Sequence, residues 1–199
     1  GDILEVRMGS FIAATMTNQL VHHMGMENMF MAMLDTPDEF HQVMELLTEG
    51  YERLYDGIEQ QGMLTPNNGN DRVCQGTFGF SDSLPATGFD PQHCRLRDLW
   101  GYMDSQETVG ISPAMFGEFI FPYYQRILKK FGLVVYGCCE PVHPLWDDYL
   151  SRVDNIRKVS ISAWCDEAFM GERLRGSRVI YQRKPSPNFV GVGERLDED

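Results

Sequence analysis

Four side chains that can ligate a metal lie within one short segment of this sequence, Gly137 to His143. They are Cys138, Cys139, Glu140 and His143. Thiolate, carboxylate and imidazole groups all bind zinc, so the segment is a candidate zinc site. A zinc-bound thiolate stays ionised at neutral pH and remains nucleophilic, which suits the transfer of a group to or from a thiol. In the alternative interpretation the two thiols are buried and inert.

Reactive or charged side chains also follow other apolar runs of the chain. The candidate catalytic residues are Asp104, Gln106, Glu107 and Asp166, and the candidate substrate-binding residues are Tyr136, Trp164, Arg183 and Lys184. The acidic and amide groups would orient a substrate and its leaving group, and the two cations would hold substrate carboxylates. For residues 104–107, a hydrated loop or a helix cap is an equally good interpretation.

These side chains require a scaffold of alternating helices and strands. The order Ser112-Pro113 suits a helix N-cap followed by proline at the first helical position. Apolar residues then recur at helical spacing to Phe131, and Gly132 ends the predicted helix. The run Leu-Val-Val-Tyr at 133–136 is typical of a buried parallel strand, with the metal-ligand segment at its exit.

The second half of the chain repeats this arrangement. Strands are predicted at about 99–103, 156–162 and 177–183, with a helix at 167–174, which favours a parallel α/β sheet. Active sites of such sheets lie at the carboxyl ends of the strands. Nearer the N-terminus, Thr36-Pro37 begins a long amphipathic helix that ends near Gly62. Residues 63–98 show no clear periodicity and are expected to form a long loop or insertion, in which His93 and Cys94 are a weaker zinc candidate than a solvated loop.

Composition limits the classes of function. The net charge is −12 and no basic stripe with interleaved aromatics occurs, which argues against a nucleic-acid partner. No apolar run approaches the length of a membrane span, and no signal pattern opens the sequence, so a cytoplasmic protein is expected. The five cysteines lack the spacing of a disulfide framework.

Several of these segments together resemble the uroporphyrinogen decarboxylase superfamily, which also contains the cobalamin:coenzyme M methyltransferases. The resemblance covers about residues 15–189. The segments that carry it are Gly25–Asn28, Asp35–Asp38, Gln106-Glu107, Ile111–Tyr123, Tyr136–Cys138, Ser162–Asp166 and Arg183–Pro187.

The resemblance implies a (β/α)8 TIM-barrel fold with its active site at the carboxyl ends of the strands. In the methyltransferase branch, zinc is held by a His-x-Cys pair and a later Cys; Cys138 matches the cysteine of the pair, and Tyr136 stands at the histidine position. Because the chain offers five or six strands, we expect an incomplete barrel in a single domain, from a longer protein.

Three functions are consistent with these expectations. The first is a methyltransferase-like enzyme that uses zinc and a thiol or corrinoid-linked methyl substrate, with a corrinoid protein as a partner. The second is decarboxylation of a tetrapyrrole or another carboxylated small molecule. The third is a non-catalytic binding module, since a fold alone does not determine function.

Overall fold

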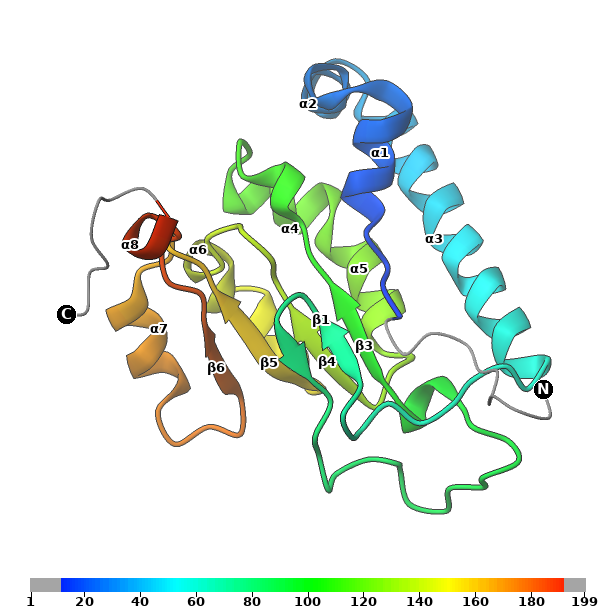
Figure 1. Ribbon diagram of the computed structural model, residues 1–199. Coiled ribbons are helices and arrows are strands. Elements are labelled where there is room, and N and C mark those ends of the chain that lie inside the picture. The colour runs from blue at the N-terminus through cyan, green and yellow to red at the C-terminus, as the bar shows by residue number, and fades with distance from the viewer. Residues whose placement is uncertain (1–11, 192–199) are drawn as a thin grey trace.

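Residues 12–191 are described by the computed structural model, which combines helices with a parallel β-sheet (Figure 1). Within these residues the sheet has four strands that follow one another in space as in sequence: β3 (Trp100–Met103), β4 (Leu133–Tyr136), β5 (Ile156–Ile161) and β6 (Ile180–Arg183). Ala13 forms an isolated parallel bridge with Tyr102 and so extends the β3 edge. The predicted parallel α/β arrangement is confirmed. The apolar residues at 3–16 also predict a strand, and most of this segment lies outside the described residues.

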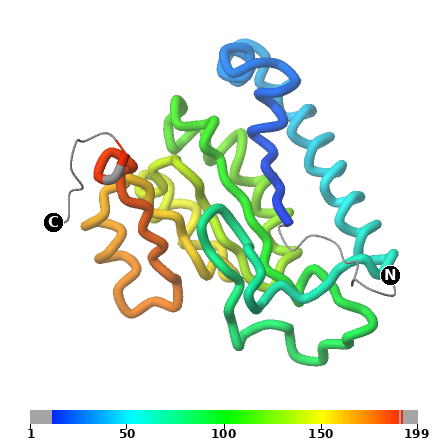
Figure 2. The backbone as a smooth tube through the Cα atoms, viewed as in Figure 1, coloured from blue at the N-terminus to red at the C-terminus, as the bar shows by residue number. Residues whose placement is uncertain are grey.

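The prediction of a (β/α)8 barrel, even an incomplete one, is wrong. The described residues contain six strands, and two of these form a separate antiparallel hairpin: β1 (Arg72–Cys74) and β2 (Thr77–Phe78). Four parallel strands are too few to curve round and pair the first with the last. The hairpin crosses the sheet face that would line the interior of a barrel (Figure 2). The sheet is therefore open, with the hairpin as a cover.

Both faces of the sheet are buried, each against a different layer. Val134, Val159 and Ile161 belong to the larger core cluster, which the helices complete. Trp100 and Val135 point to the opposite face and pack with hairpin residues and Leu84 in a second cluster. Burial on both sides explains why the central strands are apolar almost throughout.

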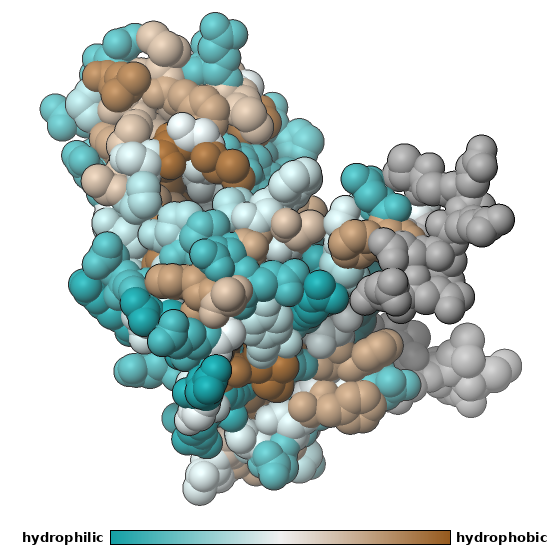
Figure 3. Space-filling view, turned by 90° about the vertical axis from the view of Figure 1, so that its left-hand side faces the viewer, coloured by the Kyte–Doolittle hydropathy of each residue, from teal (hydrophilic) through white to brown (hydrophobic). Residues whose placement is uncertain are grey.

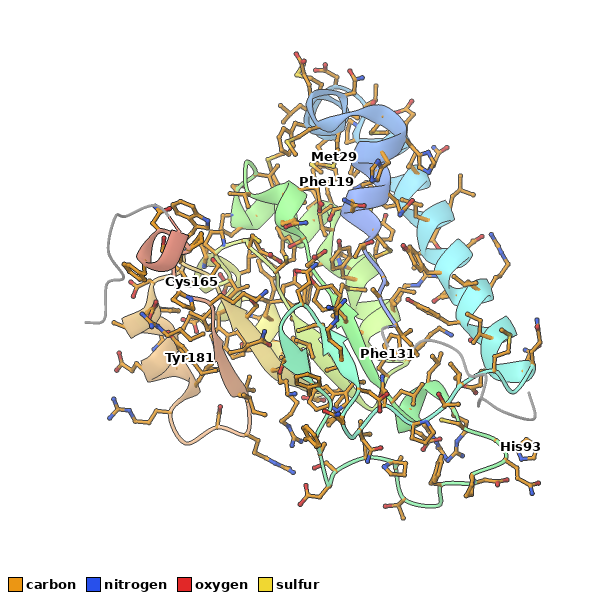
Figure 4. The ribbon with its side chains drawn as sticks, viewed as in Figure 1. Met29, His93, Phe119, Phe131, Cys165 and Tyr181 are labelled. Atoms are coloured by element: carbon orange, nitrogen blue, oxygen red, sulfur yellow. The ribbon has the colours of Figure 1, made fainter. Side chains whose placement is uncertain are left out.

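The helices lie mainly on the side of the sheet opposite the hairpin (Figure 1). They are α1 (Met16–Met24), α2 (Met26–Asp35), α3 (Pro37–Gln60), α4 (Pro113–Phe119), α5 (Phe121–Leu128), α6 (His143–Trp146), α7 (Glu167–Leu174) and α8 (Asn188–Gly191). The predicted helices at 37–62 and 167–174 are confirmed. Phe119 of α4 and Met29 of α2, labelled in Figure 4, are buried in the larger cluster.

The single helix predicted from residue 113 to 131 is wrong at its centre. Ser112 does cap the start, because its hydroxyl oxygen accepts the Met115 N–H at 3.2 Å. The helix ends at Phe119, and a second begins at Phe121 with Pro122 in its first turn. Proline has no N–H to donate to the preceding turn and its ring crowds that turn, so the chain restarts there.

The segment at 63–98 is a loop only in part, since it contributes the hairpin and a 3-10 turn, Leu96–Asp98. His93 lies on the outer loop at the opposite end of the molecule from Cys165 (Figure 4). Its ring pairs with Asp90 at 2.8 Å and is exposed, whereas Cys94 is buried. The two residues therefore do not face a common site.

None of the helices in residues 12–191 combines the length and apolar character needed to cross a lipid bilayer.

Candidate functional site

The register of the sheet brings the predicted residues to one edge. Met103 pairs with Tyr136, and Ile161 pairs with Arg183, so the segments after these strands begin at similar levels. Carboxyl ends of parallel strands meet at the same sheet edge. This edge holds the candidate site.

Asp104 directly follows β3 and has a strongly perturbed carboxyl group. Its side chain is buried, at 2% exposure. Oδ2 accepts the Tyr102 hydroxyl at 2.6 Å, whereas Oδ1 has no hydrogen-bond partner among the described residues. Burial raises the pKa of Asp104 to about 6; the Tyr102 hydrogen bond opposes this, and the charges of Glu140 and Glu107 add to it. A carboxyl group of this kind can give or take a proton near neutral pH.

Glu140 joins the exits of β3 and β4. Its two carboxylate oxygens accept the backbone N–H of Ser105 at 2.9 Å and that of Cys138 at 2.8 Å. The side chain is 2% exposed, so these are charge-assisted bonds inside the protein. Glu140 therefore fixes the backbone directly after Asp104 and at Cys138.

Glu107 connects the same edge to the N-terminal helices. Its carboxylate accepts the Thr17 hydroxyl at 2.8 Å and the Asn18 amide at 3.1 Å. Both partners belong to α1. A third bond, from Gln106 at 3.4 Å, is longer. Glu107 thus holds α1 beside the candidate site.

Two buried tyrosines support the backbone around Asp104. The Tyr124 hydroxyl donates to the Asp104 carbonyl oxygen at 2.8 Å, and the Tyr136 hydroxyl lies 2.8 Å from the Ser105 hydroxyl. Tyr136 is fully buried and faces the helices. It therefore positions the β3 exit and has no surface for a substrate, contrary to its assigned binding role.

Cys138 is buried under the tip of the hairpin. Its Sγ donates to the Gln75 side-chain oxygen and lies 3.5 Å from the Sγ of Cys139, which is exposed. Burial and the contact with Cys139 raise the pKa of Cys138 to about 12, although Lys184 opposes the shift. The Cys138 thiol is accordingly neutral in this arrangement.

The four predicted zinc ligands do not converge. Both Glu140 oxygens accept backbone N–H groups, and Nδ1 of His143 accepts the Asp166 N–H at 3.1 Å. In residues 12–191 no group of three or more His, Cys, Asp or Glu side chains is arranged to hold a metal ion. The four predicted ligands therefore do not fit a zinc ion in this arrangement. Among these four, the side chains of Cys138 and Cys139 alone contact each other.

A hollow of about 570 Å³ opens beside this cluster. Its lining residues are Met26, Gln106, Glu107, Val109, Cys139, Glu140, Pro141 and Trp164. Trp164 is 76% exposed, so its indole face is free to receive a flat or apolar group. Figure 3 shows apolar surface gathered over α1 and α2, where Met26 lies. The hollow is large enough for a small-molecule ligand.

Two predicted site residues lie outside the cluster. Asp166 caps α7 by accepting the Phe169 N–H at 2.9 Å. Arg183 pairs with Glu167 at 2.9 Å on the exposed side of α7 and β6. Both have structural partners that explain them. Lys184, in contrast, reaches the cluster and donates to the Cys138 carbonyl oxygen at 3.2 Å.

Sequence reasoning missed Tyr102, Ser105 and Gln75. Tyr102 lies two residues before Asp104 on the same sheet face, so strand alternation could have paired them. Gln75 lies in the segment at 63–98 and is separated from Cys138 by 63 positions, so no local pattern indicates their contact.

No protein-family model, curated protein or solved structure matches the chain.

Proposed function

We propose that this protein is an enzyme of the uroporphyrinogen decarboxylase superfamily that decarboxylates a small carboxylated substrate, with Asp104 as the proton donor. The observation that carries the proposal is the Asp104 carboxyl group, which is buried, has one oxygen without a partner among residues 12–191, and has a pKa of about 6. The superfamily assignment is supported by the sequence resemblance over residues 15–189.

The proposed decarboxylation requires the transfer of one proton to the substrate. When the bond between the substrate carbon and its carboxylate breaks, CO2 leaves and the electron pair stays on carbon. The Asp104 carboxyl group then gives its proton to that carbon and becomes a carboxylate, which regains a proton from water. Tyr102 holds the second oxygen of Asp104, so the free oxygen is the one available for transfer.

The hollow would receive the rest of the substrate. Trp164, Val109 and Met26 provide apolar walls. Cys139 also lines the hollow and lies 3.5 Å from Cys138, whose carbonyl oxygen accepts a hydrogen bond from Lys184. Lys184 would attract the substrate carboxylate. The free state of all five cysteines agrees with the cytoplasmic location that we also propose.

The test is CO2 release from a panel of carboxylated compounds, tetrapyrroles included, by the wild type and Asp104→Asn. Loss of a general acid lowers turnover by roughly 10²–10⁴-fold. Glu118→Gln, at an exposed helix position, is the matched control and should leave turnover unchanged. Equal turnover by the wild type and Asp104→Asn would refute the assignment.

A second candidate is transfer of a methyl group between a corrinoid-bound carrier and a thiol, with a corrinoid protein as partner. The contact between Cys138 and Cys139 favours it, because Cys139 faces the hollow. Metal analysis of the wild type and Cys138→Ser tests the zinc that the superfamily resemblance implies. About one zinc per chain, lost in the variant, would support methyl transfer. If the protein binds no metal and Asp104→Asn does not change turnover, a non-catalytic binding module is the remaining hypothesis.

A further inference from the structure

Lys158 is a buried cation on the hairpin side of the sheet. It lies on β5 with 5% exposure, and its Nζ donates to the Phe78 carbonyl oxygen and lies 3.5 Å from the Thr77 hydroxyl. The same ammonium group lies 4.6 Å from the centre of the Trp100 ring. Burial lowers the pKa of Lys158. Both of these oxygen partners are neutral.

Lys184 is a second cation that extends over the same face. Its Nζ donates to the Cys138 carbonyl oxygen at 3.2 Å. Both lysines act on Cys74: burial raises the pKa of this thiol, and the two positive charges oppose the rise. Cys74 belongs to β1 of the hairpin. The contacts agree with this placement: Lys158 bonds to β2, and Lys184 bonds to Cys138, which also contacts Gln75 at the hairpin tip.

Neither lysine forms an ion pair with an acidic side chain in residues 12–191, where other Lys and Arg side chains do. The chain carries 29 acidic residues, so carboxylates are not scarce. Buried lysines are seldom left without a counter-charge, because desolvation of the ammonium group is costly. The two ammonium groups donate instead to the backbone carbonyl oxygens of Phe78 and Cys138.

We propose that Lys158 and Lys184 form a binding site for a doubly charged oxyanion, either a phosphate or a dicarboxylate, beneath the β1–β2 hairpin. The proposal rests on the proposed function in one respect: the anion would be part of the substrate of Asp104. Two cations match two negative charges, and charge-assisted hydrogen bonds would replace the weaker bonds to carbonyl oxygens.

The base and the tip of the hairpin are held by different contacts. At its base, the Trp100 indole N–H donates to the Gly79 carbonyl oxygen at 2.7 Å, and a Cβ on Gly79 would meet the Asn67 carbonyl oxygen at 1.8 Å. At its tip, Gln75 meets Cys138 and Gln182 through single hydrogen bonds. The hairpin crosses over the sheet in Figure 2. We therefore expect the tip and β2 to lift while the base stays in place.

The test is equilibrium binding by calorimetry, with inorganic phosphate and glutarate as separate probes. We expect the binding of one probe to weaken about tenfold in Lys158→Met and about tenfold in Lys184→Met, the loss of one charge-assisted hydrogen bond. Lys130→Met removes a cation that pairs with Asp56 at 2.6 Å and should leave binding unchanged. Binding of inorganic phosphate would indicate a phosphate site, and binding of glutarate would indicate a dicarboxylate site.

Hydrogen exchange provides a second measurement on the same samples. The β2 amides should exchange faster when the anion is bound. The Gly79 amide at the base, which donates to the Asp71 carbonyl oxygen at 2.8 Å, should keep its protection. If Lys158→Met does not fold, Lys158→Arg is the variant to use instead. It keeps the positive charge and should retain binding. Asp104→Asn should also retain binding, which separates this proposal from the proposed reaction. No binding of either probe, or an equal loss in Lys130→Met, would overturn it.

Discussion

Replacing Asp104 by asparagine should change how the stability of this protein depends on pH. The ordinary pKa of an aspartate is 3.8, and burial raises that of Asp104 to about 6. Between these values the folded protein binds this proton more tightly than the unfolded chain does. The free energy of unfolding therefore falls as pH rises through this interval, and the loss is complete above the folded-state pKa. Asparagine has the same shape and no titrating group, so the variant should lack this component.

The two pKa values give the size of the effect. A difference of about two units corresponds to about 3 kcal/mol, at about 1.4 kcal/mol per unit. Urea denaturation at intervals from about pH 4 to about pH 8 measures it, provided that unfolding is two-state. The stability of the wild type relative to Asp104→Asn should fall by about 3 kcal/mol over this range. Parallel curves for the two proteins would refute the burial argument, and Glu118→Gln should run parallel to the wild type.

Three further substitutions test the scaffold and the hollow. Gly101→Ala should lower the free energy of unfolding by about 1–3 kcal/mol in urea denaturation, because the new Cβ would lie 2.4 Å from the Phe131 ring; an unchanged midpoint would contradict the packing. Glu140→Ala leaves two buried backbone N–H groups without their acceptor and should cost about 3 kcal/mol, measured as a lower thermal midpoint. Trp164→Ala should alter stability by less than about 0.5 kcal/mol yet raise KM for any substrate, since the ring is 76% exposed on the hollow; an unchanged KM would remove Trp164 from the site.

The regular elements could be predicted from the sequence because their signals are local. Helix α3 is indicated by Thr36-Pro37 and by the amphipathic spacing of its 24 residues, and β4 by four consecutive apolar residues. The break between α4 and α5 was also signalled by Pro122, but the continuing apolar spacing concealed it. Local patterns therefore identified most of the sheet and its longest helix.

Local patterns could not show whether the sheet closes into a barrel, because closure depends on how distant segments meet. The deciding element is the hairpin, whose strands span three residues and two residues. Such short strands show no reliable alternation, and Gly76 at their turn resembles any loop glycine. Their position on the sheet depends on Trp100 and Asn67, which are 33 positions apart in sequence. A family resemblance implied a closed sheet where the chain builds a covered one.

For the candidate site, the ends of the predicted strands indicated where polar side chains gather but not which groups they bond to. Asp104, Glu107 and Cys138 were identified because polar side chains followed apolar runs, and they do meet at one edge. Asp166 satisfies the same pattern and serves as a helix cap. The difference lies in the next element of the chain: a helix begins directly after Asp166, so its oxygen is taken by that helix.

Lys158 shows why alternation alone can misplace a charge. The run Ile-Arg-Lys-Val-Ser-Ile-Ser alternates like a strand with one solvated face, and the polar side would then be assigned to water. In the fold that side lies under the hairpin, and Lys158 and Ser160 are both buried. A lysine in such a place must either fasten the hairpin or bind a ligand that the hairpin admits. The bonds from Lys158 to β2 use only neutral oxygens. An anion that reaches this face would therefore compete for the same ammonium group and displace β2 from it.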